Sequence, residues 1–275
     1  PSPSPVERSF RLRTKNSIWN IEASKYKVIR ESPMQTLAYG NLIMRKQCVF
    51  GLNSYKSALE IRDYAKQNRL SKNQADLRGA VKIGVIDDEK FIAFGSLKAH
   101  GYDVIELPDI SRIDDVADFD IILCDLMGVG KHFDAKAGGG SIIREVKKNF
   151  PTKFVIAYTG ARANSTEAIL AQKNCDFFVK KDADMEEWTK TLDECVEHLL
   201  DPYLMWLDAR QALLDAETDI RDVVRFEHSY VKAVIDRDKN FGELRRAIGR
   251  ADMSGHAKGI IQSLIASAIY AVIFS

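Results

Sequence analysis

The sequence predicts an α/β fold built around a doubly wound, five-stranded parallel sheet. The evidence is a series of short, almost continuous apolar runs, each followed by a stretch with helical spacing. Runs of this kind are typical of strands buried on both faces, as in parallel sheets covered by helices. The expected strands are 81–87, 103–107, 119–125, 153–160 and 176–181. In such a sheet, ligands bind at the carboxyl ends of the strands.

The stretches between these runs have the composition of helices. The first helical stretch reaches His100 and is followed by Gly101, which suits the turn that closes many helices. A short polar helix is expected before the third strand, and amphipathic helices are expected at 140–150, 165–174 and 185–200. This alternation indicates repeated βα units.

Charge divides the 275 residues into three segments. Residues 1–82 carry 16 Lys and Arg against 6 Asp and Glu, residues 83–201 carry 14 against 23, and residues 202–275 carry 10 against 10. The net charges are therefore +10, −9 and 0. We expect three units: a small basic α+β module at 1–80, the α/β domain at 81–201 and a helical region at 202–275.

The basic module begins with PSPSPVERS, whose prolines predict a flexible lead-in. Residues 53–70 predict an amphipathic helix with a capping box from Ser57 to Glu60, and residues 71–80 predict a polar linker. The apolar positions expected on that helix are Leu59, Tyr64 and Leu70. Basic and aromatic residues alternate here, as in nucleic-acid-binding proteins, but docking on the acidic central unit of the same chain or of a dimer mate is favoured by charge.

The helical region contains a near-heptad apolar stripe between Leu213 and Val234. This stripe needs a partner helix, either in the same chain or in a second copy, and a homodimer through residues 202–275 is expected. The last stretch, 258–275, is apolar but interrupted by polar residues and is shorter than the ~20 residues that span a bilayer. A buried or dimer-forming helix is therefore favoured over contact with a membrane.

The cysteine and histidine patterns argue against disulfides and zinc. The 4 cysteines lie far apart without a CxxC pair, and no secretory signal is visible at the start of the sequence. We therefore expect reduced thiols in a cytoplasmic protein. The 5 histidines show no metal spacing such as HExxH.

Polar residues follow four of the expected strands. They are Asp87 and Asp88 after the first strand, Asp125 after the third, Thr159 after the fourth and Lys180 after the fifth. Three carboxylates at one rim repel one another unless a hard cation such as Mg²⁺ lies among them. A lysine and a hydroxyl nearby would supply donors for an anion, which suits phosphoryl transfer to a carboxylate nucleophile.

This set of residues resembles the receiver domain of two-component response regulators, the CheY-like family with a flavodoxin-like fold. The motifs are VIDDE at 85–89, ILCDLM at 122–127, AYTG at 157–160 and FFVKK at 177–181. No single motif is specific, but the four occur in order at successive strand ends. The resemblance covers residues 81–201.

The resemblance implies that Asp125 accepts a phosphoryl group from a sensor histidine kinase or a phosphotransfer protein. Asp88 and Asp125 would bind Mg²⁺ directly with the backbone carbonyl of Met127, and Asp87 would act through water. The protein would then be a phosphoprotein that signals through altered contacts, not an enzyme with a separate substrate.

The resemblance also implies a switch. Thr159 would bond the phosphoryl oxygen, Lys180 would form an ion pair with it, and the aromatic Phe177, three residues before Lys180, would rotate as the hydroxyl moves. Output would pass through the surface of the fourth helix, fifth strand and fifth helix.

Two departures from the family lie beside the site. Lys181 stands where the family has a proline after the lysine, and the loop from Asp125 to Gly140 is longer than usual. The glycines of that loop do not match a dinucleotide fingerprint or a P-loop, so a flexible surface loop is expected. Two other functions stay open: a nucleic-acid-binding regulator and a pseudo-receiver scaffold that is never phosphorylated.

Overall fold

The computed structural model describes residues 55–64, 66, 73–134, 136–160, 166–267, 270, 273 and 274. The predicted lead-in, most of the basic module, its nucleic-acid interpretation and Leu70 lie outside the described residues. Lys56–Ser275 forms one compact unit.

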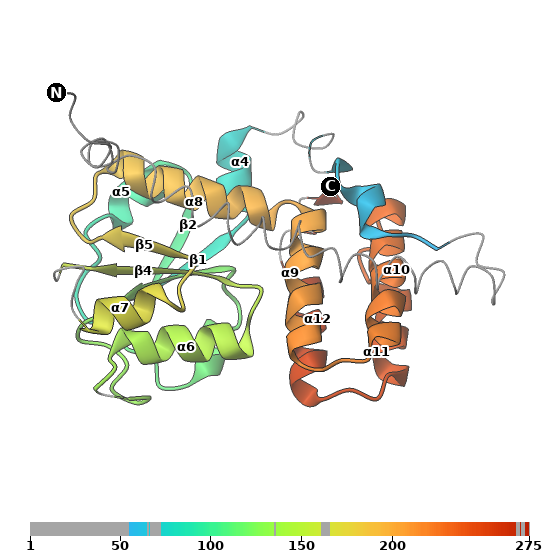
Figure 1. Ribbon diagram of the computed structural model, residues 1–275. Coiled ribbons are helices and arrows are strands. Elements are labelled where there is room, and N and C mark those ends of the chain that lie inside the picture. Colours follow the sequence, from blue (N-terminus) through green and yellow to red (C-terminus); the bar gives the residue numbers. More distant parts are fainter. Residues whose placement is uncertain are drawn as a thin grey trace, which may run out of the picture. The chain divides into compact units, whose positions relative to one another are not determined.

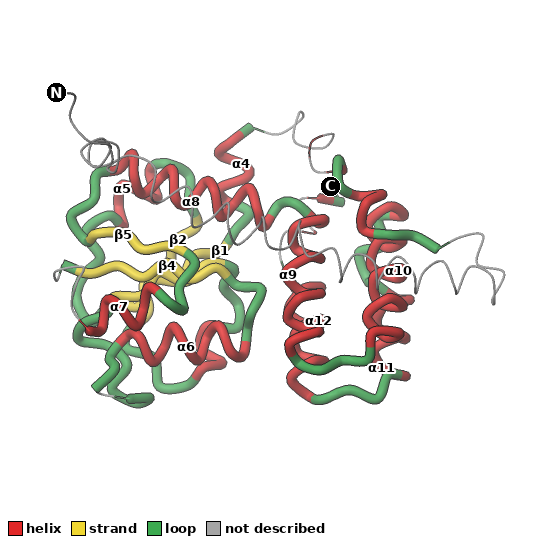
Figure 2. Tube along the Cα trace, viewed as in Figure 1, coloured by secondary structure: helices red, strands yellow, loops and turns green. Residues whose placement is uncertain are grey.

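The sheet is the one that the apolar runs predict. Its five strands are all parallel, in the order β2-β1-β3-β4-β5 (Figures 1 and 2). The strands are β1 (Lys82–Ile86), β2 (Asp103–Leu107), β3 (Ile121–Asp125), β4 (Phe154–Thr159) and β5 (Phe177–Lys180). The doubly wound fold is therefore confirmed.

Helices cover both faces of this sheet. Figure 1 shows α5 (Phe94–Ala99) and α8 (Met185–Leu199) on one face, and α6 (Gly139–Asn149) and α7 (Thr166–Gln172) on the other. The short polar helix expected before β3 is a 3-10 helix, η3 (Ile113–Val116). Gly101 has φ 90° directly after α5, as its closing role requires.

The two faces have separate cores because side chains alternate along each strand. On β4, Ile156 and Tyr158 belong to the core beneath α5 and α8, while Val155 and Ala157 belong to the core beneath α6 and α7. Both sets are fully buried. This alternation decides which residues of β4 and β5 can meet at the strand ends.

The chain after β5 and α8 continues into four helices, α9 (Pro202–Asp215), α10 (Ile220–Asp236), α11 (Gly242–Arg250) and α12 (Gly255–Ala266). Asp201 caps α9 by accepting from the Tyr203 amide at 2.9 Å, and Pro202 occupies the first turn. The apolar stripe is buried within this chain: Leu213, Val223, Tyr230, Val231 and Val234 are all 0% exposed. Its partner is therefore found without a second copy, and the homodimer stays a prediction.

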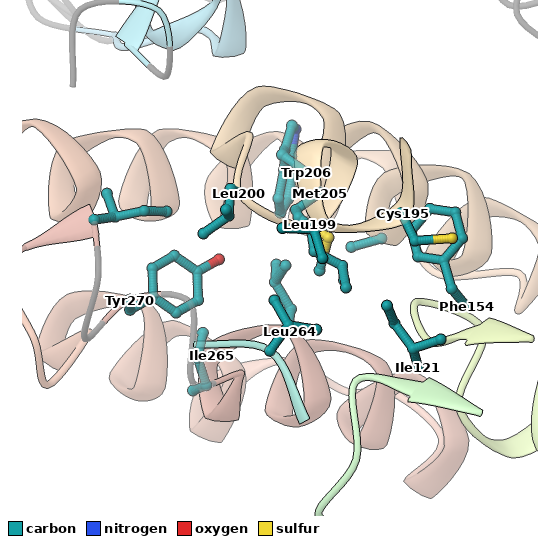
Figure 3. Packing of buried hydrophobic residues seen from close by; sticks show 14 of the residues in the cluster. Ile121, Phe154, Cys195, Leu199, Leu200, Met205, Trp206, Leu264, Ile265 and Tyr270 are labelled. Carbon is teal, nitrogen blue, oxygen red and sulfur yellow. The ribbon is translucent and has the colours of Figure 1, made fainter. Parts of the chain in front are cut away.

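These helices share their core with the α5 and α8 face of the sheet. Figure 3 shows Ile121 and Phe154, the first residues of β3 and β4, beside Leu264 of α12 and Leu199 of α8. Ser267 donates to Asp120, directly before β3, at 3.0 Å. The helical region thus packs against the amino ends of the strands.

The prediction that Leu59 is a buried apolar position was wrong. Leu59 is 64% exposed, and the buried residues of the 3-10 helix η2 (Ala58–Ile61) are Ala58 and Ile61. The capping contact is confirmed, since the Ser57 amide donates to Glu60 at 3.2 Å.

The predicted linker contains a helix, α4 (Gln74–Gly79), capped by Asn73. Its sequence is mostly polar, but Leu77 packs against the core and Arg78 forms an ion pair with Asp193 of α8 at 2.6 Å.

The described cysteines are Cys124, Cys175 and Cys195, and all three are buried thiols outside any disulfide. Within the described ranges, no helix has both the length and the apolar character needed to cross a membrane. The apolar residues of α12 are instead covered by the rest of the chain, with Ile260, Ile261 and Leu264 at 0% exposure. A buried helix is therefore confirmed for residues 255–266.

Candidate functional site

The structure gathers the three predicted carboxylates at the carboxyl end of the sheet. Asp87 and Asp88 follow β1, Asp125 ends β3, and one oxygen of each lies within 4.8 Å of the others. Asp87 and Asp125 are buried, whereas Asp88 is exposed. Since β1 and β3 are hydrogen-bonded neighbours, their parallel register is what brings these acids together.

Lys181 neutralises part of this negative charge. Its Nζ lies 2.7 Å from Oδ2 of Asp125 and 3.1 Å from Oδ2 of Asp87. Burial of the ammonium opposes its charge, but the hydrogen bonds to Asp125 and Asp87 outweigh burial, so the pKa of Lys181 is raised. The lysine is therefore a fixed cation between two carboxylates.

The ion pair expected of Lys180 is thus made by Lys181, and the position predicted from the sequence needs correction. Lys180 is the last residue of β5, pairs with Thr159 in the ladder and is exposed. Lys181 is the first residue beyond the strand, where the chain turns and its amide donates to the Thr159 carbonyl at 3.0 Å. The turn carries its side chain across the strand ends to Asp125.

The aromatic residue predicted to act as the switch, Phe177, is also displaced by one position from the residue that lies on the Thr159 face. Phe177 packs in the core of α5 and α8, 6.3 Å from Phe154 between ring centroids. Thr159 follows Tyr158 and therefore faces the opposite side of the sheet, where Phe178 packs. Phe178 is three residues before Lys181, the spacing that was expected between Phe177 and Lys180. The structure does not bring Phe177 to Thr159.

Tyr158 is a site residue that the sequence interpretation missed. Its hydroxyl donates to Oδ2 of Asp87 at 2.9 Å, and the side chain is completely buried. Burial, followed by the nearby charge of Asp87, raises the pKa of Tyr158 far above its ordinary value, so the residue is a neutral donor. The adjoining motif drew attention only to Thr159, because an aromatic in a buried strand ordinarily indicates packing.

Thr159 and Met127 both lie at the carboxyl end of the sheet. Thr159 ends β4 and is 2% exposed. The Met127 amide donates to Oδ1 of Asp125 at 3.2 Å, while its side chain is 53% exposed. The loop then passes so near Asp88 that a Cβ on Gly128 would lie 2.1 Å from both carboxylate oxygens. The backbone of residues 127–128 thus borders the acidic cluster.

The glycine-rich loop after Asp125 is a close-packed turn rather than slack chain. A Cβ on Gly139 would lie 1.9 Å from the Asp125 carbonyl oxygen, and one on Gly130 would lie 2.3 Å from the Gly138 carbonyl oxygen. Asp109 anchors the loop by accepting from the Gly130 amide at 2.7 Å. The glycines therefore allow the backbone of the loop to pack closely on itself. The Gly130 and Gly139 amides already donate to Asp109 and to the Leu126 carbonyl.

A pocket of about 220 Å³ opens beside Asp87 between the ends of β1 and β2. Its lining residues are Val85, Asp87, Glu89, Lys90, Glu106, Leu107 and Pro108. Pockets that enclose drug-sized ligands are ~300–1,000 Å³ and mostly apolar. This small, charged pocket suits an ion and its waters better than a nucleotide.

Comparison with known proteins gives matches in structure only. No protein-family model matches the chain, and no curated protein matches its sequence. The BeF3-activated N-terminal receiver domain of RstA from Klebsiella pneumoniae is 17% identical with a TM-score of 0.35, and the match covers 42% of this chain and 97% of that chain.

Two other solved structures are similar to the same extent. The beryllofluoride-activated NtrC4 receiver domain dimer is 24% identical with a TM-score of 0.35, covering 42% of this chain and 96% of that one. A CheY-like receiver domain protein from Methanospirillum hungatei JF-1 is 18% identical with a TM-score of 0.33, covering 42% and 95%.

The strand order of this chain shows its fold independently of those matches. The order β2-β1-β3-β4-β5, with helices on both faces, is the flavodoxin-like arrangement that CheY also has. The central part of this chain therefore has a flavodoxin-like fold.

Proposed function

We propose that the protein is a response regulator in which Asp125 accepts a phosphoryl group from the phosphohistidine of a sensor kinase or phosphotransfer protein. The main support is the ammonium of Lys181, 2.7 Å from Asp125 within a cluster of three carboxylates. A buried carboxylate beside a fixed cation is suited to nucleophilic attack, because the charge of the product is then neutralised in place.

The donor set of the cluster fits Mg²⁺. Its side-chain ligands are all carboxylate oxygens, which a hard cation prefers, and one acid is exposed so that retained waters have space. Asp88 and Asp125 would hold the ion with the Met127 carbonyl, and Asp87 would act through water. When bound, the ion would offset negative charge on the phosphoryl oxygens.

The residues of this chain have separate tasks in the proposed step. An oxygen of Asp125 attacks phosphorus, an O–P bond forms as the P–N bond to the donor histidine breaks, and the electron pair of that bond stays on the imidazole. Lys181, which takes the role first expected of Lys180, pairs with a phosphoryl oxygen. Thr159 donates its hydroxyl to another oxygen.

The output is a changed protein contact. Phe178 of β5 lies on the Thr159 face, in the core that includes Ala168 and Ala171 of α7, and takes the switch role first expected of Phe177. Because α8 shares a core with α9 and α12, a shift at the α8 surface would reach the helical region. We expect the oligomeric state, including a homodimer through residues 202–275, to depend on phosphorylation, and we place the protein in the cytoplasm with its kinase.

The decisive experiment is incubation with Mg²⁺ and a small phosphodonor such as acetyl phosphate, followed by intact mass measurement. We expect one added phosphoryl group in the parent protein and none in Asp125→Asn. No adduct with several donors, together with no Mg²⁺ binding by calorimetry, would leave the pseudo-receiver scaffold as the function. Light scattering with and without beryllofluoride tests the output, and identical masses would contradict a change of oligomeric state.

A further inference from the structure

Tyr158 connects the acidic cluster to the buried core of α5 and α8. It is the residue before Thr159 on β4, and register pairs it with Asp125 on β3. Its side chain points away from Thr159, into the core shared with Phe91 and Trp188. The hydroxyl then reaches Asp87 across β3, which lies between β1 and β4 in the sheet.

The Asp87 carboxylate is held by three donors of different kinds. Oδ1 accepts from the Glu89 amide at 2.9 Å, and Oδ2 accepts from the Tyr158 hydroxyl at 2.9 Å. Lys181 is the third, 3.1 Å from Oδ2, and it also bonds Asp125. Lys181 has a flexible side chain and divides its contacts between Asp87 and Asp125, so its bond to Asp87 is lost when the ammonium moves to another partner.

The Tyr158 hydroxyl and the Lys181 ammonium affect the charge of Asp87 differently. Lys181 lowers the negative charge that attracts a divalent ion, whereas a tyrosine hydroxyl orients Asp87 and leaves its full charge available. When Lys181 turns to a phosphoryl group, Tyr158 would still hold Oδ2. Asp87 would then keep its orientation through both states of the site.

The packing of Tyr158 fixes where its hydroxyl lies. Its ring centroid is 5.2 Å from that of Phe91 and 5.8 Å from that of Trp188, and Phe91 and Trp188 meet edge to face at 5.3 Å. All three side chains are at most 1% exposed. A ring enclosed in this way cannot rotate out, so the hydroxyl is preorganised by the core.

We infer that Tyr158 is a positioning residue for Asp87, which it orients for binding of a divalent cation in the phosphoryl-acceptor site. The inference rests on the proposed function, since it assigns Asp87 to that site. It predicts that removing a single oxygen atom outside the carboxylate cluster weakens cation binding.

The test is Tyr158→Phe, which keeps the packed ring and removes the hydroxyl. We expect Mg²⁺ affinity, measured by isothermal titration calorimetry, to fall by about 10-fold, the lower end of the loss usual for outer-shell partners of a metal site, because Asp87 acts on the ion through water. The rate of phosphorylation at saturating Mg²⁺ should recover most of its parent value. Unchanged Mg²⁺ affinity in Tyr158→Phe would overturn the inference.

Tyr102→Phe is a matched control. Tyr102 is also buried and its hydroxyl donates to a carboxylate, that of Asp193 at 2.6 Å, but it lies at the amino end of β2. It should lose some stability and keep the parent Mg²⁺ affinity. An equal loss of affinity in Tyr102→Phe would show a general effect of destabilisation and would also overturn the inference.

Asp87→Asn completes a double-mutant cycle. If Tyr158 acts through Asp87, adding Tyr158→Phe to Asp87→Asn should change Mg²⁺ affinity by less than about 2-fold. A full additional loss would mean that Tyr158 acts by another route. A parent protein that binds no Mg²⁺ and accepts no phosphoryl group would overturn the proposed function, whereas a competent parent with an equally competent Tyr158→Phe overturns this inference alone.

Discussion

At the carboxyl end of the sheet, three carboxylates lie within 4.8 Å of one another and the Lys181 ammonium contacts two of them, whereas the amino ends of β3 and β4 are covered by apolar side chains of α8 and α12. The first arrangement keeps Asp88 exposed, and the second leaves Ile121 and Leu264 at 0% exposure. Charge is concentrated at the proposed functional site, and apolar contact is concentrated where the sheet meets the helices of the same chain.

One sheet can therefore carry its charged groups at one end and its contact with other helices at the opposite end. The three carboxylates at the carboxyl end repel one another, and Lys181 offsets only part of that charge, so this end adds less stability to the fold. The amino end of the sheet stabilises the fold by burying apolar area against the helices. Four substitutions test whether this separation is real.

Leu264→Ala should have the largest effect on stability. It removes a fully buried side chain from the contact of α12 with the sheet, which costs about 2–5 kcal/mol in the free energy of unfolding. Urea denaturation measures the loss, and Leu59→Ala, at 64% exposure, should stay within about 0.5 kcal/mol of the parent. A fall in the Mg²⁺ affinity of the folded Leu264→Ala protein would show that the two ends are coupled.

Lys181→Met should destabilise the protein by about 1.5–3 kcal/mol without Mg²⁺, because charged hydrogen bonds are lost and the acids repel. Saturating Mg²⁺ should restore much of that loss by replacing the missing positive charge. Thermal unfolding with and without the ion measures both effects. Lys180→Met is the matched variant, and a larger effect there would restore Lys180 as the site lysine.

Gly139→Ala should cost about 1–3 kcal/mol and slow phosphorylation, because the new Cβ would lie 1.9 Å from the Asp125 carbonyl oxygen. Gly140→Ala, the next residue in α6, meets nothing within 4 Å and should gain up to about 1 kcal/mol from helix propensity. Denaturation midpoints and phosphorylation rates distinguish the pair. Equal denaturation midpoints and phosphorylation rates in the two variants would mean that the loop backbone can shift to accommodate the added Cβ.

Lys153 tests the amino end of the sheet, where its effect is small at neutral pH and appears only above about pH 8. Burial lowers its pKa from 10.5 to about 8 while its Nζ donates to the carbonyls of Ala117 and Phe119. Between pH 8 and 10.5 the unfolded chain binds more protons, so stability should rise relative to Lys153→Met by at most about 1.4 kcal/mol per pH unit. An NMR titration of Lys153 with its midpoint near 10.5 would contradict this.

Several features could be predicted from local pattern alone. The strands were recognisable because burial on both faces requires continuous apolar runs, and their carboxyl ends then identify Asp87, Asp88, Asp125 and Thr159. The position of Gly101 followed from the backbone conformation that ends α5. These inferences depend only on residues adjacent in the chain.

The two errors at the site, Lys180 in place of Lys181 and Phe177 in place of Phe178, depend on where strand β5 ends. FFVKK contains two adjacent lysines and two adjacent aromatics, and the side-chain period of 2 means that an error of one residue moves every side chain to the other face. Only the ladder between β4 and β5, ending at Thr159 and Lys180, shows that Lys181 lies at the site and that Phe178 shares the face of Thr159.

The doubly wound sheet, the order of its elements and the acids at its carboxyl end could all be predicted without a structure, because each follows from local burial and spacing. Tertiary structure alone decided that Lys181 neutralises Asp125, that Tyr158 reaches Asp87, and that the helical stripe is covered within the chain. Those contacts join residues far apart in the sequence, so their distances depend on strand register and packing, which no local pattern encodes.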